Sequence, residues 1–320
     1  MSNEGRAVAP LTLAGVLALA AAIGASGPAA RIPAQADDET IVRTFRLGEG
    51  ARLDLSNLAG DINVTGVDGD ELEIRATIRS RGRRNAADQV QIDFEERRSG
   101  VVVRTYPRGG DGRNARVDFL VRLPGGVEAE IQTVSGDITA MGVTGAFRGQ
   151  SVSGDLTITS AGALDRAETV SGDLELDDIA SQGLLYLSSV SGDVSARRLQ
   201  APELELETVS GDVLLSDAAV SRFRLETVSG EVEYRGALSA GGRYDFNSHS
   251  GDVLLVVEGG FRLDAETFSG NLRPEVELTV EPGGVFSGRD RQRALSGVHG
   301  DGGAILNVTT FSGNLYLRQP

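Results

Sequence analysis

The 320-residue sequence contains no cysteine, no tryptophan and no lysine, and aromatic residues make up only 5% of it. Without cysteine the chain has no disulfide framework, no thiolate metal site, no cysteine nucleophile and no lipid-modified cysteine. The 31 basic residues are therefore all arginine, and they stand against 46 acidic residues, for a formal net charge of -15. This acidity argues against a nucleic-acid partner, because nucleic-acid binders act largely by neutralising phosphates.

A long apolar run occurs only near the N-terminus. Arg6 precedes an apolar stretch from Leu11 to Ile23, and small residues then lead to Ala36. This order is typical of a signal peptide, and the run is shorter than the roughly 20 residues that span a bilayer. We therefore predict a cleaved signal peptide over residues 1–36 and no transmembrane segment after cleavage. The mature protein is expected to be exported, either periplasmic or at the cell surface and beyond.

Glycine is abundant, with 42 residues, and many of these glycines recur at one position of a repeat. Val-Ser-Gly-Asp occurs five times, and four related tetrapeptides follow it. The repeated glycines, which we call the corner glycines, are Gly136, Gly154, Gly172, Gly192, Gly211, Gly230, Gly251, Gly270 and Gly313. The first eight lie 18 to 21 residues apart, a period that suits one coil of a β-solenoid.

Apolar residues form columns around the corner glycines. They stand two and four places after each glycine, as Leu174 and Leu176 do, and five and seven places before it, as Leu225 and Phe223 do. Spacing of two indicates strands with one buried face, and glycine allows a tight bend between two strands. The sequence thus predicts an all-β fold, a single-chain parallel β-solenoid like a β-helix, with coils of about 18–21 residues.

The same pattern divides the chain. Residues 37–124 form an irregular β-rich N-terminal section that contains a first coil at Leu53–Val64 and longer alternating strands rich in arginine. Residues 125–320 carry the repeats, with an expected loop at 281–303 before a final coil.

The N-terminal leader, the Leu53–Val64 coil, the run Arg116-Val-Asp-Phe-Leu-Val-Arg-Leu-Pro and the serial Val-Ser-Gly-Asp units resemble a bacterial putative-adhesin family of domain-of-unknown-function proteins. The resemblance covers nearly the whole mature chain. It implies a right-handed β-solenoid, of the β-helix type, in the cell envelope or outside it. It brings no catalytic residues, so none are assigned.

A column of acidic residues follows the corner glycines and includes Asp137, Asp155, Asp173, Asp193, Asp212 and Asp252. Stacked carboxylates about 4.8 Å apart repel by roughly 1 kcal/mol in water. We expect them to point toward solvent and to accept backbone N–H bonds at the corner. The alternative is a row of calcium ligands, but each coil lacks the Gly-Gly-x-Gly-x-Asp unit of calcium β-rolls. No metal site is therefore assigned with assurance, and no cofactor is expected.

Two further features were weighed as sites. Ser or Thr stands three places before each corner glycine, as at Thr208 and Thr227, without a recurring base beside it, so polar satisfaction near the corner is favoured over nucleophilic catalysis. Of the two histidines, His249 replaces a valine in an otherwise apolar column, which favours a tolerated substitution over a catalyst, and His299 lies in the glycine-rich loop. The densest basic group is a candidate contact for anionic polymer and comprises Arg79, Arg81, Arg83 and Arg84.

These observations favour an exported, non-enzymatic scaffold that acts in an adhesin-like way at the envelope or cell surface. Its expected partner is an envelope polymer, a lipid headgroup or another surface protein. The alternatives are a carbohydrate-active β-helix enzyme of the polysaccharide-lyase type and a subunit that senses envelope stress.

Overall fold

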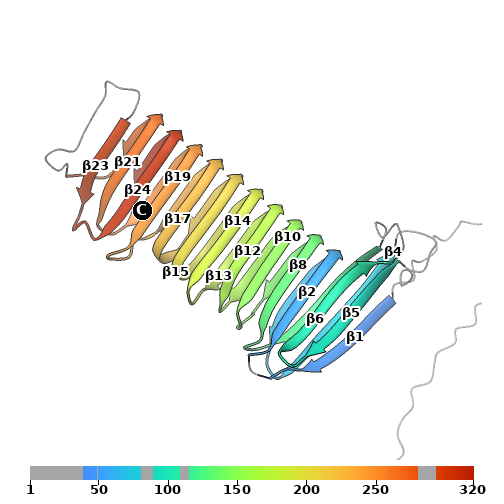
Figure 1. Ribbon diagram of the computed structural model, residues 1–320. Helices are drawn as coiled ribbons and strands as arrows, with labels where there is room; N and C mark the ends of the chain where they lie inside the picture. Colours follow the sequence, from blue (N-terminus) through green and yellow to red (C-terminus); the bar gives the residue numbers. More distant parts are fainter. Residues whose placement is uncertain (1–38, 49, 81–88, 109–114, 280–292) are drawn as a thin grey trace, which may run out of the picture. The chain divides into compact units, whose positions relative to one another are not determined.

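The computed structural model describes residues 39–48, 50–80, 89–108, 115–279 and 293–320. These residues form strands and turns, without a helix among them, which confirms the all-β prediction (Figure 1). The expected signal peptide over residues 1–36 lies outside the described residues. Within them, no helix has the length and hydropathy to cross a membrane.

The strands make one hydrogen-bonded sheet that is folded at each coil into two faces. Face 1 contains the strands that lead into the corners and, at its two ends, strands outside the repeat. In stacking order these are β5 (Val90–Arg97), β6 (Gly100–Pro107), β2 (Arg52–Ala59), β8 (Glu128–Ser135), β10 (Phe147–Ser153), β12 (Leu164–Ser171), β14 (Leu184–Ser191), the second half of β15 (Val194–Ser210), β17 (Ala219–Ser229), β19 (Arg243–Ser250), β24 (Ala304–Ser312), β21 (Phe261–Ser269) and β23 (Arg293–His299).

Face 2 contains the strands that follow the corners and, at the N-terminal end, strands outside the repeat. In stacking order these are β1 (Glu39–Arg46), β4 (Glu71–Ser80), β7 (Ala115–Pro124), β3 (Ile62–Val67), β9 (Ile138–Met141), β11 (Leu156–Ala161), β13 (Leu174–Ala180), the first half of β15, β16 (Val213–Ser216), β18 (Val232–Ala237), β20 (Val253–Glu258), β25 (Leu315–Arg318) and β22 (Leu272–Pro274).

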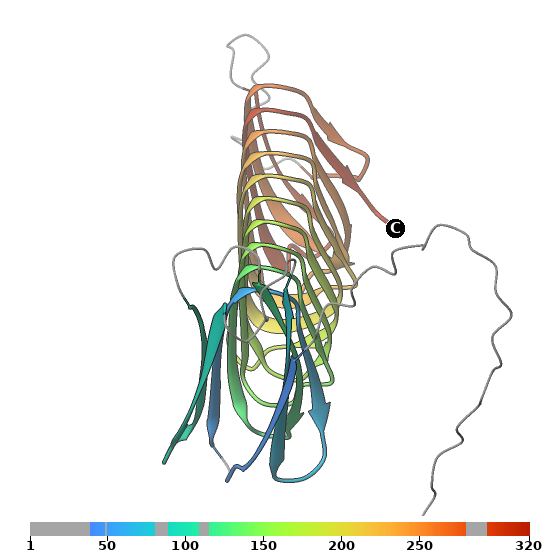
Figure 2. The ribbon, with the colours of Figure 1, turned by 90° about the vertical axis from the view of Figure 1, so that its right-hand side faces the viewer.

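Successive coils pair in parallel and in register, as the solenoid prediction requires. Leu156 pairs with Leu174, and Leu174 pairs with Val194 on the next coil. Figure 2 looks along the stack and shows the coils behind one another. The predicted β-solenoid is therefore confirmed.

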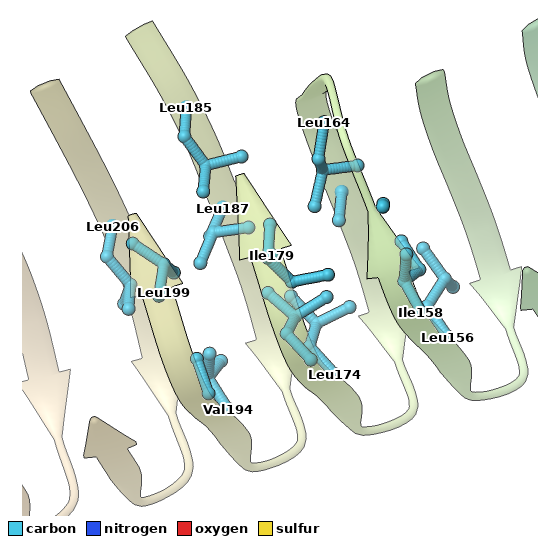
Figure 3. Close-up of a cluster of buried hydrophobic side chains, with 14 of the residues drawn as sticks. Leu156, Ile158, Leu164, Leu174, Ile179, Leu185, Leu187, Val194, Leu199 and Leu206 are labelled. Carbon is cyan, nitrogen blue, oxygen red and sulfur yellow. The ribbon is translucent and has the colours of Figure 1, made fainter. Parts of the chain in front are cut away.

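The core lies between the two faces and forms one continuous cluster. Figure 3 shows its central part, where Leu185 and Leu187 of face 1 approach Ile179 and Leu174 of face 2. Each coil contributes a few apolar side chains, which a coil on its own would leave partly exposed. Apolar surface is therefore buried only when the coils stack. The apolar columns read from the sequence are therefore the core.

The corner glycines are required by a close approach between coils. Gly192 has a φ of +153°, and a Cβ atom built on it would lie 2.0 Å from the carbonyl oxygen of Gly172. The same crowding recurs at the other corners, because each corner glycine lies against the carbonyl of the preceding corner in the stack. At the C-terminal end Gly313 lies against Gly251, and Gly270 lies against Gly313. No side chain fits this position without moving the stack.

The N-terminal section closes one end of the stack with antiparallel strands. β5 pairs with β6 on face 1, while β1 pairs with β4 and β4 with β7 on face 2. The long alternating strands predicted before residue 124 are thus present.

The other end differs from the prediction in two ways. The last coil in sequence, β24 and β25, is inserted between the coil of β19 and β20 and the coil of β21 and β22. In addition, β23 lies within the expected loop at 281–303 and pairs antiparallel with β21; residues 280–292 lie outside the described residues. The glycine and arginine content of this stretch suggested a loop, but an antiparallel edge strand needs only backbone pairing on one side.

Candidate interaction groove

The acidic residues after the corner glycines cap backbone groups of the neighbouring coil. Asp137 Oδ1 accepts the N–H of Asp155 at 3.0 Å, and Asp155 Oδ1 accepts the N–H of Asp173 at 2.9 Å. Equivalent bonds join further coils through Asp173, Asp193, Asp212, Asp252 and Asn314. We call this series the acidic ladder. The expectation that its carboxylates accept corner N–H bonds is confirmed.

The acidic ladder is a line of single carboxylates rather than a cage. Among the residues that the structure describes, no group of three or more His, Asp or Glu is placed to hold a metal ion. One oxygen of each bonded aspartate already accepts a backbone N–H, which leaves the ladder poorly arranged for calcium, an ion that prefers 6 to 8 oxygen ligands.

Of the candidate arginines, only Arg79 is described. Its guanidinium pairs with Asp118 Oδ2 at 2.6 Å, and Asp118 Oδ1 accepts the N–H of Asp61. Asp61 follows Gly60, and its Oδ1 accepts the N–H of Asp137 at 3.2 Å. Arg79 therefore belongs to the N-terminal end of the acidic ladder. Arg81, Arg83 and Arg84 lie outside the described residues, so their proposed contact with anionic polymer stays a prediction.

The Ser and Thr residues three places before the corners point into the core. Thr169 Oγ1 donates to the Gly154 carbonyl at 3.3 Å, and Thr310 Oγ1 donates to Thr267 Oγ1 at 2.9 Å. The buried members of this hydroxyl column are Thr133, Ser151, Thr169, Ser189, Thr208, Thr227, Ser248, Thr267 and Thr310. Four of these hydroxyls, at Thr133, Ser189, Thr208 and Ser248, have no hydrogen-bond partner among the described residues, so the expected polar satisfaction holds for only part of the column.

The residue after each hydroxyl faces outward and forms an apolar stripe along face 1. It is the first residue of the Val-Ser-Gly motif, and its Val and Phe members are 43% to 49% exposed. In stacking order the apolar stripe consists of Val134, Val152, Val170, Val190, Val209, Val228, His249, Phe311 and Phe268. The apolar character of this column is visible in the sequence, but its place on the surface was not predicted. The sequence could have predicted this exposure, because side chains alternate along a strand and the residue one place earlier is the buried hydroxyl.

A polar column runs beside the apolar stripe, four residues before each corner. It includes Gln132 and Gln150 near the N-terminal section and Glu168, Glu207 and Glu226 farther along the stack. Together the stripe and the column enclose two neighbouring hollows of 480 Å³ and 710 Å³, which share Ser188 and Val190. We call this continuous depression on face 1 the interaction groove.

The far end of the apolar stripe is aromatic. The rings of His249 and Phe311 stack with centroids 4.9 Å apart and planes 5° apart, and Phe311 stacks on Phe268 with the same values. This order arises because β24 is inserted between β19 and β21. His249 is thus a member of a ring stack. His299, on β23, stacks on Phe261 of β21 with ring centroids 5.1 Å apart.

The acidic wall of the groove is held by local bonds. Glu168 accepts bonds from Arg166 at 2.7 Å and Gln150 at 2.6 Å. Glu207 accepts the Tyr186 hydroxyl at 2.9 Å, and burial together with this bond raises the pKa of Tyr186. Tyr186 is therefore a neutral donor near pH 7, and its bond leaves the charge of Glu207 in place.

A family model described as Toastrack DUF4097 matches residues 150–318. No curated protein matches the chain.

Several solved structures are similar at low identity. A putative adhesin from Bacteroides fragilis is 13% identical, with 87% of this chain and 96% of that chain covered and a TM-score of 0.44. A putative lipid binding protein from Parabacteroides distasonis is 9% identical, with 89% and 98% covered and a TM-score of 0.39. A putative cell adhesion protein from Clostridium sporogenes is 13% identical, with 88% and 100% covered and a TM-score of 0.24.

Proposed function

The chain belongs to the Toastrack DUF4097 family, and we propose that it uses this solenoid as an exported, non-enzymatic scaffold that binds envelope or cell-surface partners along the interaction groove. The observation that carries the proposal is the apolar stripe, which repeats one exposed apolar side chain on coil after coil. Single exposed valines are ordinary on protein surfaces, but a contiguous apolar line marks an interaction site.

The stack makes many weak contacts additive. Each coil presents one residue of the apolar stripe and one of the polar column at the same height, so a partner that lies along the groove repeats the same small contact several times. Contacts made by one rigid surface add without a new ordering cost for each. An extended face therefore supports recognition better here than any one pocket.

A binding role accounts for the chemistry of face 1 better than catalysis does. The hydroxyl column is buried, and the ring of His249 is stacked on Phe311. A hydrolase or lyase groove would break the repeat with irregular acids and bases, whereas the coils from Gly154 to Gly211 keep the same columns. Export is proposed from the N-terminal apolar run alone.

The direct test is binding of purified residues 37–320 to fractionated envelope of the source cell, at low and high salt and with and without Ca²⁺. We expect one fraction to bind in a manner that persists at high salt, because the stripe contributes apolar burial. If the protein binds none of the fractions under any of the four conditions, the proposal is contradicted. Release of unsaturated sugars from an acidic polysaccharide, lost on chelation, would establish the enzyme alternative instead.

A further inference from the structure

The lining of the 710 Å³ part of the interaction groove combines apolar and acidic side chains. It is lined by Val209, Val228 and Phe311 on one side and by Glu207 and Glu226 on the other. No arginine is among its described lining residues, although Arg224 beside the groove pairs with Glu226. A partner that fills it must present an apolar strip with positive charge beside the strip. An anionic lipid surface does not satisfy this requirement, because the glutamates repel its headgroups.

The spacing of the apolar stripe matches one kind of polypeptide surface. Ring centroids on neighbouring coils are 4.9 Å apart, and an α-helix that lies along the stack repeats every 5.4 Å. One apolar residue per helical turn therefore meets about one stripe residue per coil. An extended β-strand does not fit as well, because its same-face side chains recur at about 6.8 Å.

The length of the groove also suits a helix. Its larger part runs from Ser188 on β14 to Phe268 on β21 and crosses six coils, through β15, β17, β19 and β24. Five steps of about 4.8 Å make roughly 24 Å, the length of about 16 helical residues. A helix of this length has four turns with which to contact the groove.

From these observations we infer that the interaction groove binds a basic amphipathic α-helix of a partner protein, with the apolar face of the helix on the stripe and its arginines or lysines beside Glu207 and Glu226. This inference rests on the proposed function, since it names the partner class of the same groove. Helix-in-groove binding uses apolar anchors at i, i+3, i+4 and i+7, which is the pattern that the stripe requires.

The test uses an 18-residue peptide of leucine and lysine arranged as an amphipathic helix, with a peptide of identical pattern in which glutamate replaces lysine as its control. Binding to the full chain is measured by fluorescence anisotropy of the labelled peptides. We expect the Leu/Lys peptide to bind and the Leu/Glu peptide to bind at least about tenfold more weakly.

Variants locate the site. Val209→Ser with Val228→Ser is expected to weaken binding of the Leu/Lys peptide by about tenfold or more, because each serine removes apolar contact area. Leu214→Ser is the matched control, since Leu214 is 41% exposed on face 2 of the same coil as Val209. Glu226→Gln is expected to weaken binding and to flatten its salt dependence, and Glu233→Gln on face 2 is its control.

Three results would overturn the inference: equal binding of both peptides, equal losses in the face 1 and face 2 variants, or groove-dependent binding of phosphatidylglycerol vesicles in place of the peptide. The proposed function is judged separately. If envelope binding is lost in Val209→Ser with Val228→Ser while the Leu/Lys peptide never binds, the helix inference fails and the scaffold proposal stands. If the envelope does not bind either, both fail.

Discussion

At the scale of single residues, the corner glycine is fixed by what lies next to it. The carbonyl of one corner occupies the place where the next corner would carry its Cβ, with 2.1 Å at Gly154 and 2.0 Å at Gly192. The constraint is steric and comes from the neighbouring coil, so it acts at every corner independently of the local turn.

Replacement of Gly192 by alanine tests this constraint. We expect Gly192→Ala to lower the free energy of unfolding by about 3 kcal/mol, because the stack must open to admit the methyl group. Gly183→Ala is the control, since nothing lies within 4 Å of a Cβ at Gly183. Urea denaturation followed by circular dichroism measures both, and an unchanged stability of Gly192→Ala would refute the steric account.

The aspartate after each corner gives a second prediction at this scale. Asp193 Oδ1 accepts the N–H of Asp212 at 2.8 Å, so Asp193→Ala should lower the free energy of unfolding by about 1 kcal/mol. Asp193→Asn keeps the acceptor and removes a repelling charge. It should therefore be close to neutral, as Asn314 already caps the N–H of Asn271 at 3.0 Å. Equal losses in the alanine and asparagine variants would show that the charge, rather than the acceptor, matters.

At the scale of elements, the inserted coil is the feature that joins the C-terminal strands together. β24 lies between β19 and β21, and β21 in turn carries β23. Leu306 of β24 is fully buried. Damage to this coil should therefore spread to strands that precede it in sequence.

Leu306→Ala tests the insertion. We expect a loss of about 3 kcal/mol in stability, together with faster amide hydrogen exchange in β21 and β23 as well as in β24. If β24 were instead the outermost coil, its loosening would leave the exchange of β21 unchanged. Mass-spectrometric hydrogen exchange on peptides that cover residues 261–269 distinguishes the two arrangements.

The contact between β19 and the inserted coil is pH-dependent. Burial raises the pKa of Asp245, but hydrogen bonds from Arg243 at 2.8 Å and Asn307 at 2.6 Å outweigh burial and hold the pKa below its ordinary value. A carboxyl with a lowered folded-state pKa stabilises the fold above its unfolded pKa of about 3.9, and that contribution is lost as the pH falls through the folded value.

Asp245→Asn should therefore destabilise the protein near pH 7, and the difference from wild type should shrink as the pH falls below about 4. Urea denaturation of both proteins at about pH 7 and about pH 3 measures the difference. A difference that stays constant between the two pH values would show that Asp245 contributes no pH-dependent stability.

The sequence predicted the elements more completely than their order. The period of the corner glycines and the alternation around them determine strands, corners and core, because every coil obeys the same steric and burial rules. The position of β24 was not predictable in this way, since the columns at Phe311 and Phe268 are alike and do not say which coil stacks on which. Similarly, the groove was missed although the alternation after the buried Thr208 turns Val209 outward, because an apolar residue beside a corner is more often part of the core.

At the scale of the whole described chain, the acidic residues have two separate uses. Those after the corners cap backbone N–H groups, and those of the polar column, such as Glu207, face the groove. The second set faces a partner in the groove, although Arg166 already pairs with Glu168 and Arg224 with Glu226. The basic end of the acidic ladder, where Arg79 pairs with Asp118 and Arg116 with Asp61 at 3.0 Å, offsets charge inside the stack.

The absence of cysteine makes the central claim directly measurable, because a single introduced cysteine accepts a fluorescent label at one chosen site. Val209→Cys places the label in the interaction groove, and Leu214→Cys places it on face 2 of the same coil. Both labelled proteins are mixed with the envelope fraction that binds, and collisional quenching by iodide is recorded. The account predicts that binding shields the label at residue 209 and leaves the label at residue 214 accessible, whereas shielding at residue 214 alone would contradict it.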